Sequence, residues 1–184
     1  MTKAPVRSFM ILLLLGIVLI TIALVVRSGL LLSKNPGLPI NSAMRYALSL
    51  QAPQLSTEDS LFIDKHFSTA YITPDGLRYI THDLGTGKYE AKAGDELVVN
   101  YTGQLFNGLV FDSTDKKGPF TFTLGSGAVI KGWDEGMVGM KKGEKKLLII
   151  PYWLAFGTEG KPPSIPAKAT LIFEVEVVDI HPAK

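Results

Sequence analysis

The 184-residue chain contains no cysteine. This absence excludes disulfide bonds, thiolate nucleophiles, cysteine-ligated zinc sites and a lipoprotein attachment cysteine. It leaves the redox compartment undetermined. Histidine is scarce as well, because the chain has only His66, His82 and His181. These three are too scattered along the sequence to predict a metal site or a catalytic triad, and we expect neither a metal nor a cofactor.

Neither sign of charge dominates, with 19 Lys and Arg against 17 Asp and Glu and a formal net charge of +2. The most basic stretch, residues 141–146, lacks the interleaved aromatic residues that are typical of nucleic-acid binding. We interpret it as a solvated turn and expect no nucleic-acid partner. Residues 85–88 resemble a phosphate-binding loop, but they lack the earlier glycine and the Ser or Thr after Lys88. A turn is the simpler interpretation.

One long hydrophobic run, residues 9–26, contains no charged side chain. At about 1.5 Å per residue, a helix of this length spans about 27 Å, which is close to the thickness of a bilayer core. A cleavable signal peptide is the alternative, but the run exceeds the usual length of about 7–15 residues and no small-x-small cleavage site precedes Arg27. We therefore predict an uncleaved transmembrane anchor after a tail of residues 1–8.

The charges that flank this run favour, by a slight margin, a cytoplasmic N-terminus. Lys3, Arg7 and the α-amino group precede the run, whereas Arg27 and Lys34 follow it, and positive charges prefer the cytoplasmic side. The predicted location is thus the inner cell membrane, with one span and an extracytoplasmic, periplasmic C-terminal domain.

The region after the predicted anchor divides at residues that break helices. Pro36 and Pro39 lie in a linker, residues 27–40. Residues 41–72 are predicted to form short helical segments, one capped by Asn41 and one beginning at Ser56. The second places Ile63, Phe67 and Ala70 on one face. The turn signal at residues 73–76 predicts a domain boundary, so that the main domain covers residues 73–184.

Apolar and polar residues alternate through most of this domain, which predicts β-strands with one buried face. The alternating apolar positions are Leu97, Val99 and Tyr101, then Phe120, Phe122 and Leu124, then Leu171, Phe173, Val175 and Val177. Asn107 and Gly108 predict a two-residue hairpin turn. Residues 128–137 are the one helical stretch. The pattern predicts an α+β fold in which a short helix covers one face of an antiparallel sheet.

Several short motifs follow one another in the second half of the chain. They read VVNYTG at residues 98–103, GLVFDS at 108–113, VIKGWDEG at 129–136, IP at 150–151, LAFG at 154–157, IP at 165–166 and ATLIF at 169–173. In this order they resemble the FKBP-type peptidyl-prolyl cis/trans isomerases, over residues 74–181. The resemblance implies the FKBP-like fold and isomerase activity on X–Pro bonds of unfolded or exported polypeptides. It also implies that macrolide inhibitors bind.

The resemblance further implies a prolyl pocket made by matching residues. They are Tyr101, Phe111, Asp112, Phe120, Val129, Ile130, Trp133, Phe156 and Phe173. All of them are expected to bind substrate, and all but Phe120 and Val129 are candidate catalytic residues. Trp133 would form the floor, the Ile130 backbone N–H would donate to a substrate carbonyl, and Asp112 would accept a hydrogen bond from Tyr101.

The sequence departs from the family pattern around this pocket. Phe156 stands where the family usually has a tyrosine, so a hydroxyl donor is lost. The family's arginine partner for Asp112 is absent, and Lys116 or Lys117 would replace it. Tyr152 and Trp153 add aromatic surface. The missing hydroxyl supports a second hypothesis, in which the pocket is a weakly catalytic or non-catalytic binding module for proline turns, or a chaperone for a membrane or envelope partner.

Overall fold

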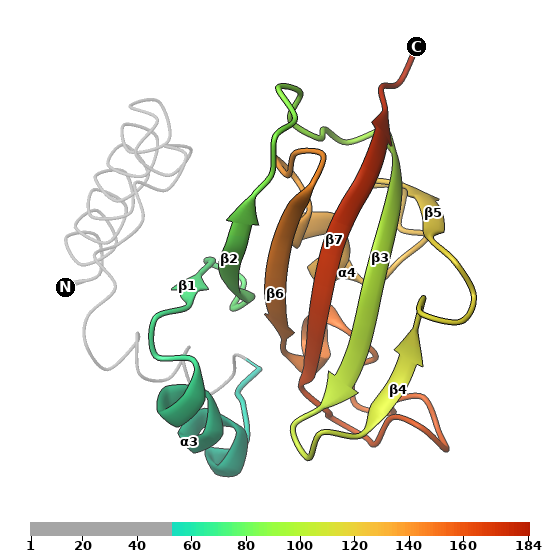
Figure 1. Ribbon diagram of the computed structural model, residues 1–184. Coiled ribbons are helices and arrows are strands. Elements are labelled where there is room, and N and C mark those ends of the chain that lie inside the picture. Colours follow the sequence, from blue (N-terminus) through green and yellow to red (C-terminus); the bar gives the residue numbers. More distant parts are fainter. Residues whose placement is uncertain (1–52) are drawn as a thin grey trace, which may run out of the picture. The chain divides into compact units, whose positions relative to one another are not determined.

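Seven antiparallel strands form one sheet in residues 53–184, the part of the chain that the computed structural model describes. The strand order is β1-β2-β6-β7-β3-β4, and β5 pairs with the first half of β3 on the edge where β4 pairs with its second half (Figure 1). The strands are β1 Tyr71–Ile72, β2 Arg78–Leu84, β3 Glu96–Leu105, β4 Val110–Ser113, β5 Phe120–Thr123, β6 Glu144–Ile150 and β7 Leu171–His181. The antiparallel sheet that the sequence predicted is confirmed.

A short helix, α4 (Lys131–Gly136), covers one face of this sheet (Figure 1). It is shorter than the predicted helix of residues 128–137. The cause is Asp134, whose carboxylate accepts hydrogen bonds from the backbone N–H groups of Gly125 and Gly127 at 2.8 and 3.1 Å. Both glycines have positive φ, so the chain before α4 forms a turn, and Ile130 is left in an extended conformation at the helix start.

The connection between β3 and β4 is also longer than the two residues that Asn107 and Gly108 predicted. Residues 106–109 lie between the strands. The Gly108 N–H donates to the Leu105 carbonyl at 2.9 Å, and the Leu105 N–H donates to the Leu109 carbonyl at 3.0 Å. Gly108 has a φ of 80°, which only glycine adopts at little cost. The hairpin is therefore confirmed, but its turn is wider.

The main core lies between the sheet and α4, as the alternating pattern predicted. Leu97, Val99 and Val177 are fully buried on this face. The two glycines of α4 allow a close approach to β6, because a Cβ on Gly132 would overlap the Ile150 side chain. Close packing of this kind fixes the position of the helix, and with it the position of Trp133.

The opposite face of the sheet is covered by a second helix, α3 (Thr57–His66). Ser56, where the sequence predicted the start of this helix, is its N-cap, since its hydroxyl accepts from the Asp59 N–H at 2.9 Å. Ile63 packs with buried side chains of β6 and β7. The Thr170 hydroxyl, just before β7, donates to Asp59 at 2.5 Å. The cluster on this face comprises Ile63, Leu147, Ile149 and Ile172, with Leu55, Phe62, Phe67, Ala70, Ile80 and Phe106 packed against it.

The docking of α3 joins this helix and the sheet in one compact unit. The compact unit runs from Pro53 to Lys184, whereas the sequence predicted a boundary at Thr73. The difference arises because α3 buries apolar side chains that would otherwise be exposed, and because β1 pairs with β2. The predicted tail, anchor, linker and the segment capped by Asn41 lie outside the described residues. Within residues 53–184, no helix is long and apolar enough to cross a membrane.

The basic stretch at residues 141–146, which the sequence predicted to be a turn, is a turn only up to Gly143, because β6 begins at Glu144; its charges are balanced. Lys142 pairs with Asp179 at 2.9 Å, and Lys146 pairs with Glu144 at 3.4 Å. Lys141 and Lys145 pair with acidic residues as well. These four lysines are therefore engaged in ion pairs with acidic residues of the same unit.

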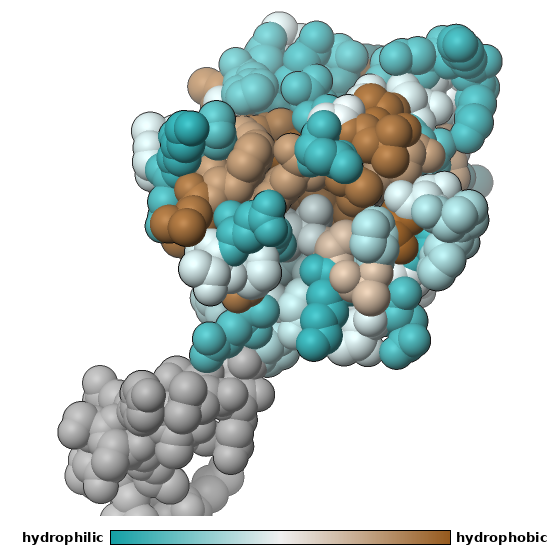
Figure 2. Space-filling model, turned by 90° about the horizontal axis from the view of Figure 1, so that it is seen from below, coloured by the Kyte–Doolittle hydropathy of each residue, from teal (hydrophilic) through white to brown (hydrophobic). Residues whose placement is uncertain are grey.

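Apolar surface remains on the outside of the molecule. The face seen from below carries apolar residues between hydrophilic patches (Figure 2). Large apolar side chains that stay exposed in the described unit include Leu61 on α3 and Leu109 and Val110 at the β3–β4 connection. On α3, Leu61 is exposed whereas Ile63 is buried. These two residues therefore form a matched pair for a stability test.

We expect Ile63→Ala to lower the free energy of unfolding of residues 53–184 by about 2–5 kcal/mol, because it leaves a cavity under α3. Leu61→Ala is the control: Leu61 is on the same helix and 65% exposed, against 2% for Ile63, and should change stability by less than about 0.5 kcal/mol. Urea unfolding followed by tryptophan fluorescence measures both. Equal losses would show that α3 does not dock on the sheet.

Candidate functional site

A groove of about 800 Å³ opens between α4, β4, β5 and the loop after residue 155. All nine residues that the sequence predicted for a prolyl pocket line it. They are Tyr101, Phe111, Asp112, Phe120, Val129, Ile130, Trp133, Phe156 and Phe173. The segments that carry them are far apart in the sequence, and the fold brings them to one place.

Trp133 occupies the centre of an aromatic cluster. Its ring centre lies 4.9 Å from that of Tyr101 and 5.2 Å from that of Phe173, at interplanar angles of 80° and 81°. Phe111 meets Phe173 in the same manner at 5.5 Å. Edge-to-face contacts are a favoured geometry for aromatic pairs. The rings therefore hold one another in fixed orientations and give the groove a rigid apolar surface.

Gly103 makes room for these rings. It lies on β3 opposite Phe173. A Cβ at this position would lie 2.6 Å from the Phe173 ring and 2.8 Å from the Phe111 ring. Both distances are too short for carbon atoms. The absence of a side chain at residue 103 thus allows the two phenylalanines to meet at the groove wall.

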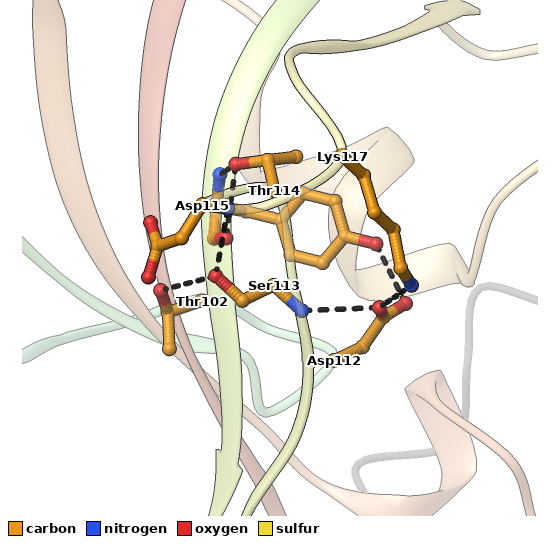
Figure 3. A network of polar contacts seen from close by, with 7 residues as sticks. Thr102, Asp112, Ser113, Thr114, Asp115 and Lys117 are labelled. Carbon is orange, nitrogen blue, oxygen red and sulfur yellow. Dashed lines mark hydrogen bonds and ion pairs between the residues drawn. The ribbon is translucent and has the colours of Figure 1, made fainter.

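The acid in the groove, Asp112, accepts hydrogen bonds from the Ser113 N–H and from two side chains. The Tyr101 hydroxyl donates to one carboxylate oxygen at 2.7 Å, and the Lys117 ammonium donates to the other at 2.8 Å (Figure 3). Lys117 thus fills the role expected of either Lys116 or Lys117. Partial burial disfavours ionisation, but the hydrogen bonds from Lys117 and Tyr101 outweigh it, so the pKa of Asp112 is lowered. Burial and the bond to Asp112 raise the pKa of Tyr101.

The loop that carries Lys117 is tied to β3 by further hydrogen bonds. The Thr114 hydroxyl accepts from the Tyr101 N–H at 2.9 Å, and the Thr102 and Ser113 hydroxyls lie 3.2 Å apart (Figure 3). Because Asp112 keeps its negative charge at neutral pH while its oxygens are engaged, it positions the groove wall. Proton transfer is a poor role for a carboxylate with a lowered pKa.

The backbone N–H of Ile130 makes no hydrogen bond within the described residues. Ile130 precedes α4 in an extended conformation, with φ of −63° and ψ of 147°, and it lines the groove. A half-buried N–H without an acceptor is costly unless a ligand satisfies it. This donor is the polar group best placed to bind a carbonyl oxygen in the groove.

The remaining lining residues were not predicted. Apart from Gly127, Ala128 and Lys131 near α4, they belong to the loop after η1 (Tyr152–Leu154), namely Ala155, Lys161, Pro162, Pro163, Ser164 and Ile165. The signal that could have found these loop residues is the pair of motifs LAFG and IP, which contain Ala155 and Ile165 and enclose the other four. Tyr152 and Trp153 do not line the groove. Trp153 instead donates to the Asp75 carbonyl at 2.8 Å, so this ring supports the turn before β2.

The groove belongs to a known class of site. Residues 87–178 match the family described as FKBP-type peptidyl-prolyl cis-trans isomerase, and the chain belongs to this family. It is 51% identical over 93 residues to peptidyl-prolyl cis-trans isomerase FKBP2 of Mus musculus, covering 50% of this chain and 66% of that protein, just under two thirds. It is 53% identical over 105 residues to an FK506-binding protein of Neisseria meningitidis serogroup B, covering 55% of this chain and 95% of the relative.

Solved structures agree with this assignment. The crystal structure of AtFKBP13 superposes with a TM-score of 0.56 at 36% identity, over 60% of this chain and 97% of that chain. FkpA from Escherichia coli superposes with a TM-score of 0.63 at 34% identity, over 78% of this chain and 67% of that chain. The predicted FKBP-like fold is therefore confirmed.

We expect Gly103→Ala to lower the free energy of unfolding by about 1–3 kcal/mol, because the added methyl group overpacks the groove wall. The near-ultraviolet circular dichroism of the aromatic residues should change with it. Gln104→Ala is the control, since Gln104 is next on β3 and its side chain lies on the opposite face. If Gly103→Ala leaves both observables unchanged, Phe111 and Phe173 do not meet at this glycine.

Proposed function

We propose that the chain catalyses cis/trans isomerisation of X–Pro peptide bonds, with the groove around Trp133 as the active site and unfolded or exported polypeptides as substrates. The observation that carries the proposal is the aromatic, half-enclosed groove with an unpaired backbone N–H at Ile130. Membership of the isomerase family supports it.

Such a groove suits a reaction that needs no nucleophile. The barrier to rotation about a peptide bond is about 18–20 kcal/mol, because the planar amide loses its resonance when it twists. The planar amide is also more polar than the twisted one. An apolar site that displaces water therefore penalises the planar ground state more than the transition state. A ten-thousandfold acceleration requires about 5.5 kcal/mol of this difference.

The Ile130 N–H orients the substrate. A donor placed on the carbonyl of the rotating bond would stabilise its planar, charge-separated form and slow the reaction. We therefore assign the Ile130 N–H to another carbonyl of the bound peptide. The prolyl ring would rest on Trp133, with Phe111 and Phe173 beside it. Tyr101 and Asp112, already bonded to each other, keep the wall in place.

A proline-peptide isomerisation assay on the full chain tests the proposal. We expect Trp133→Leu to lower kcat/KM by about tenfold or more, because the apolar floor contributes to transition-state binding. Trp153→Leu is the control, since that tryptophan does not line the groove. Thermal unfolding of each variant shows whether the fold is retained. A folded Trp133→Leu variant with undiminished kcat/KM would place the active site elsewhere.

Phe156 favours the second hypothesis, a binding module with little catalysis. Its ring lines the groove but carries no hydroxyl that could donate to a ligand. Relatives of the chain are named FK506-binding proteins, and we propose that FK506 binds in the same groove. Calorimetry with FK506 therefore distinguishes the hypotheses: a wild-type chain that binds this macrolide in the groove but does not accelerate isomerisation would be a binding module.

We further propose that residues 9–26 anchor the protein in the inner cell membrane with residues 53–184 on the periplasmic side. The support for the anchor is the uncharged run itself, and the support for the orientation is the α-amino group, which adds one positive charge to Lys3 and Arg7 before the run. We expect the full chain to stay in the membrane fraction during alkaline carbonate extraction, and a chain beginning at Pro53 to be released. Release of both would contradict the anchor, and protease protection of the full chain in inside-out vesicles tests the orientation.

A further inference from the structure

Two lysines line the groove and make no ion pair within residues 53–184. They are Lys131, the first residue of α4, and Lys161, on the loop after η1. The Lys161 ammonium lies 5.6 Å from the centre of the Phe156 ring. A cation at this distance is attracted by the aromatic face. The Phe156 ring, which carries no hydroxyl, thus holds the Lys161 ammonium at the mouth of the groove.

Five other lysines of residues 53–184 pair with acids, whereas Lys168 and some others outside the groove make no ion pair. The four lysines of residues 141–146 each pair with a carboxylate. Asp112 is the one acid among the described residues that line the groove, and Lys117 and Tyr101 already engage both its oxygens. The nearest acid in sequence to Lys161 is Glu159, which is exposed and accepts from the Thr158 hydroxyl. The groove therefore carries positive charge that its own lining does not balance.

We propose that Lys161, assisted by Lys131, makes the groove select X–Pro segments that carry a carboxylate beside the proline. This inference rests on the proposed function of the same groove. The prolyl ring is uncharged and fits the aromatic floor, so charge has to be recognised at the rim. Attraction between opposite charges is stronger beside apolar walls than in open water. An acidic residue next to the proline gains this attraction, a neutral one does not, and a basic one is repelled.

The test uses short peptides that differ at one residue. The peptides carry Glu, Gln or Lys at one of the positions beside the proline, either before it or after it. The kcat/KM of the full chain is measured for each peptide. For at least one flanking position we expect the Glu peptide to be preferred over the Gln peptide by about two- to fivefold, the range of a partly exposed ion pair. The preference should shrink as salt is raised to about 0.5 M, because screening weakens exposed charges.

Variants assign the preference to the lysine. Lys161→Gln should bring the ratio of kcat/KM for the Glu peptide to that for the Gln peptide close to one. Lys161→Glu should reverse the preference, so that the Lys peptide becomes the best substrate of the three. Lys168→Gln is the matched control, because Lys168 lies exposed on the same loop outside the groove, and it should keep the wild-type ratio. Lys131→Gln should reduce the ratio in part.

Two outcomes would overturn the inference: a wild-type ratio near one at every flanking position, or a Lys161→Gln ratio equal to that of the wild type. If the chain accelerates none of the peptides, the proposed isomerase function fails, and the charge preference is then measured from the affinities of the same peptides by calorimetry. Failure of the catalysis and failure of the charge preference are thereby separate results.

Discussion

The contact between Trp133 and Phe173 connects the fold with the groove. Trp133 comes from α4 and Phe173 from the middle of the sheet, and the two rings meet edge to face at 5.2 Å. Such a pair adds about 0.5–1.5 kcal/mol beyond the area it buries. Its geometry depends on Gly132, which lets α4 approach β6, and on Gly103, which leaves space for Phe173. The floor of the groove is therefore also part of the core, and neither can change alone.

The sequence predicted the parts of the structure that repeat or that match a known pattern. Alternation identified the buried residues of β3 and β7, such as Val99 and Val175, and the ordered motifs identified nine residues of the groove. The length of α4 could not be predicted, because Asp134 reaches back to Gly125 and Gly127 only once the turn has folded. The choice between Lys116 and Lys117 likewise depended on the path of a loop.

The boundary of the compact unit shows a different limit. A helix beginning near Ser56 with Ile63 on its apolar face is readable from the sequence, although it ends at His66, before Phe67 and Ala70. The surface that it covers is not readable. That surface consists of Leu147, Ile149 and Ile172, which are distant in the chain and become neighbours only in the sheet. The apolar residues 147–150 of β6 are buried on both faces of the sheet, and each face is covered by its own helix.

The hydrogen bond between Asp59 and Thr170 has a consequence for the protein under tension. It joins α3 to the start of β7, while β1 pairs with β2 through two residue pairs. A force pulling on the chain at Pro53 would act first on these few contacts and would peel α3 from the outer face of the sheet. The aromatic groove lies on the other face and would be spared. Loss of α3 would expose Leu147, Ile149 and Ile172 to water, so tension on the chain at Pro53 would be felt as exposed apolar surface on the face away from the groove.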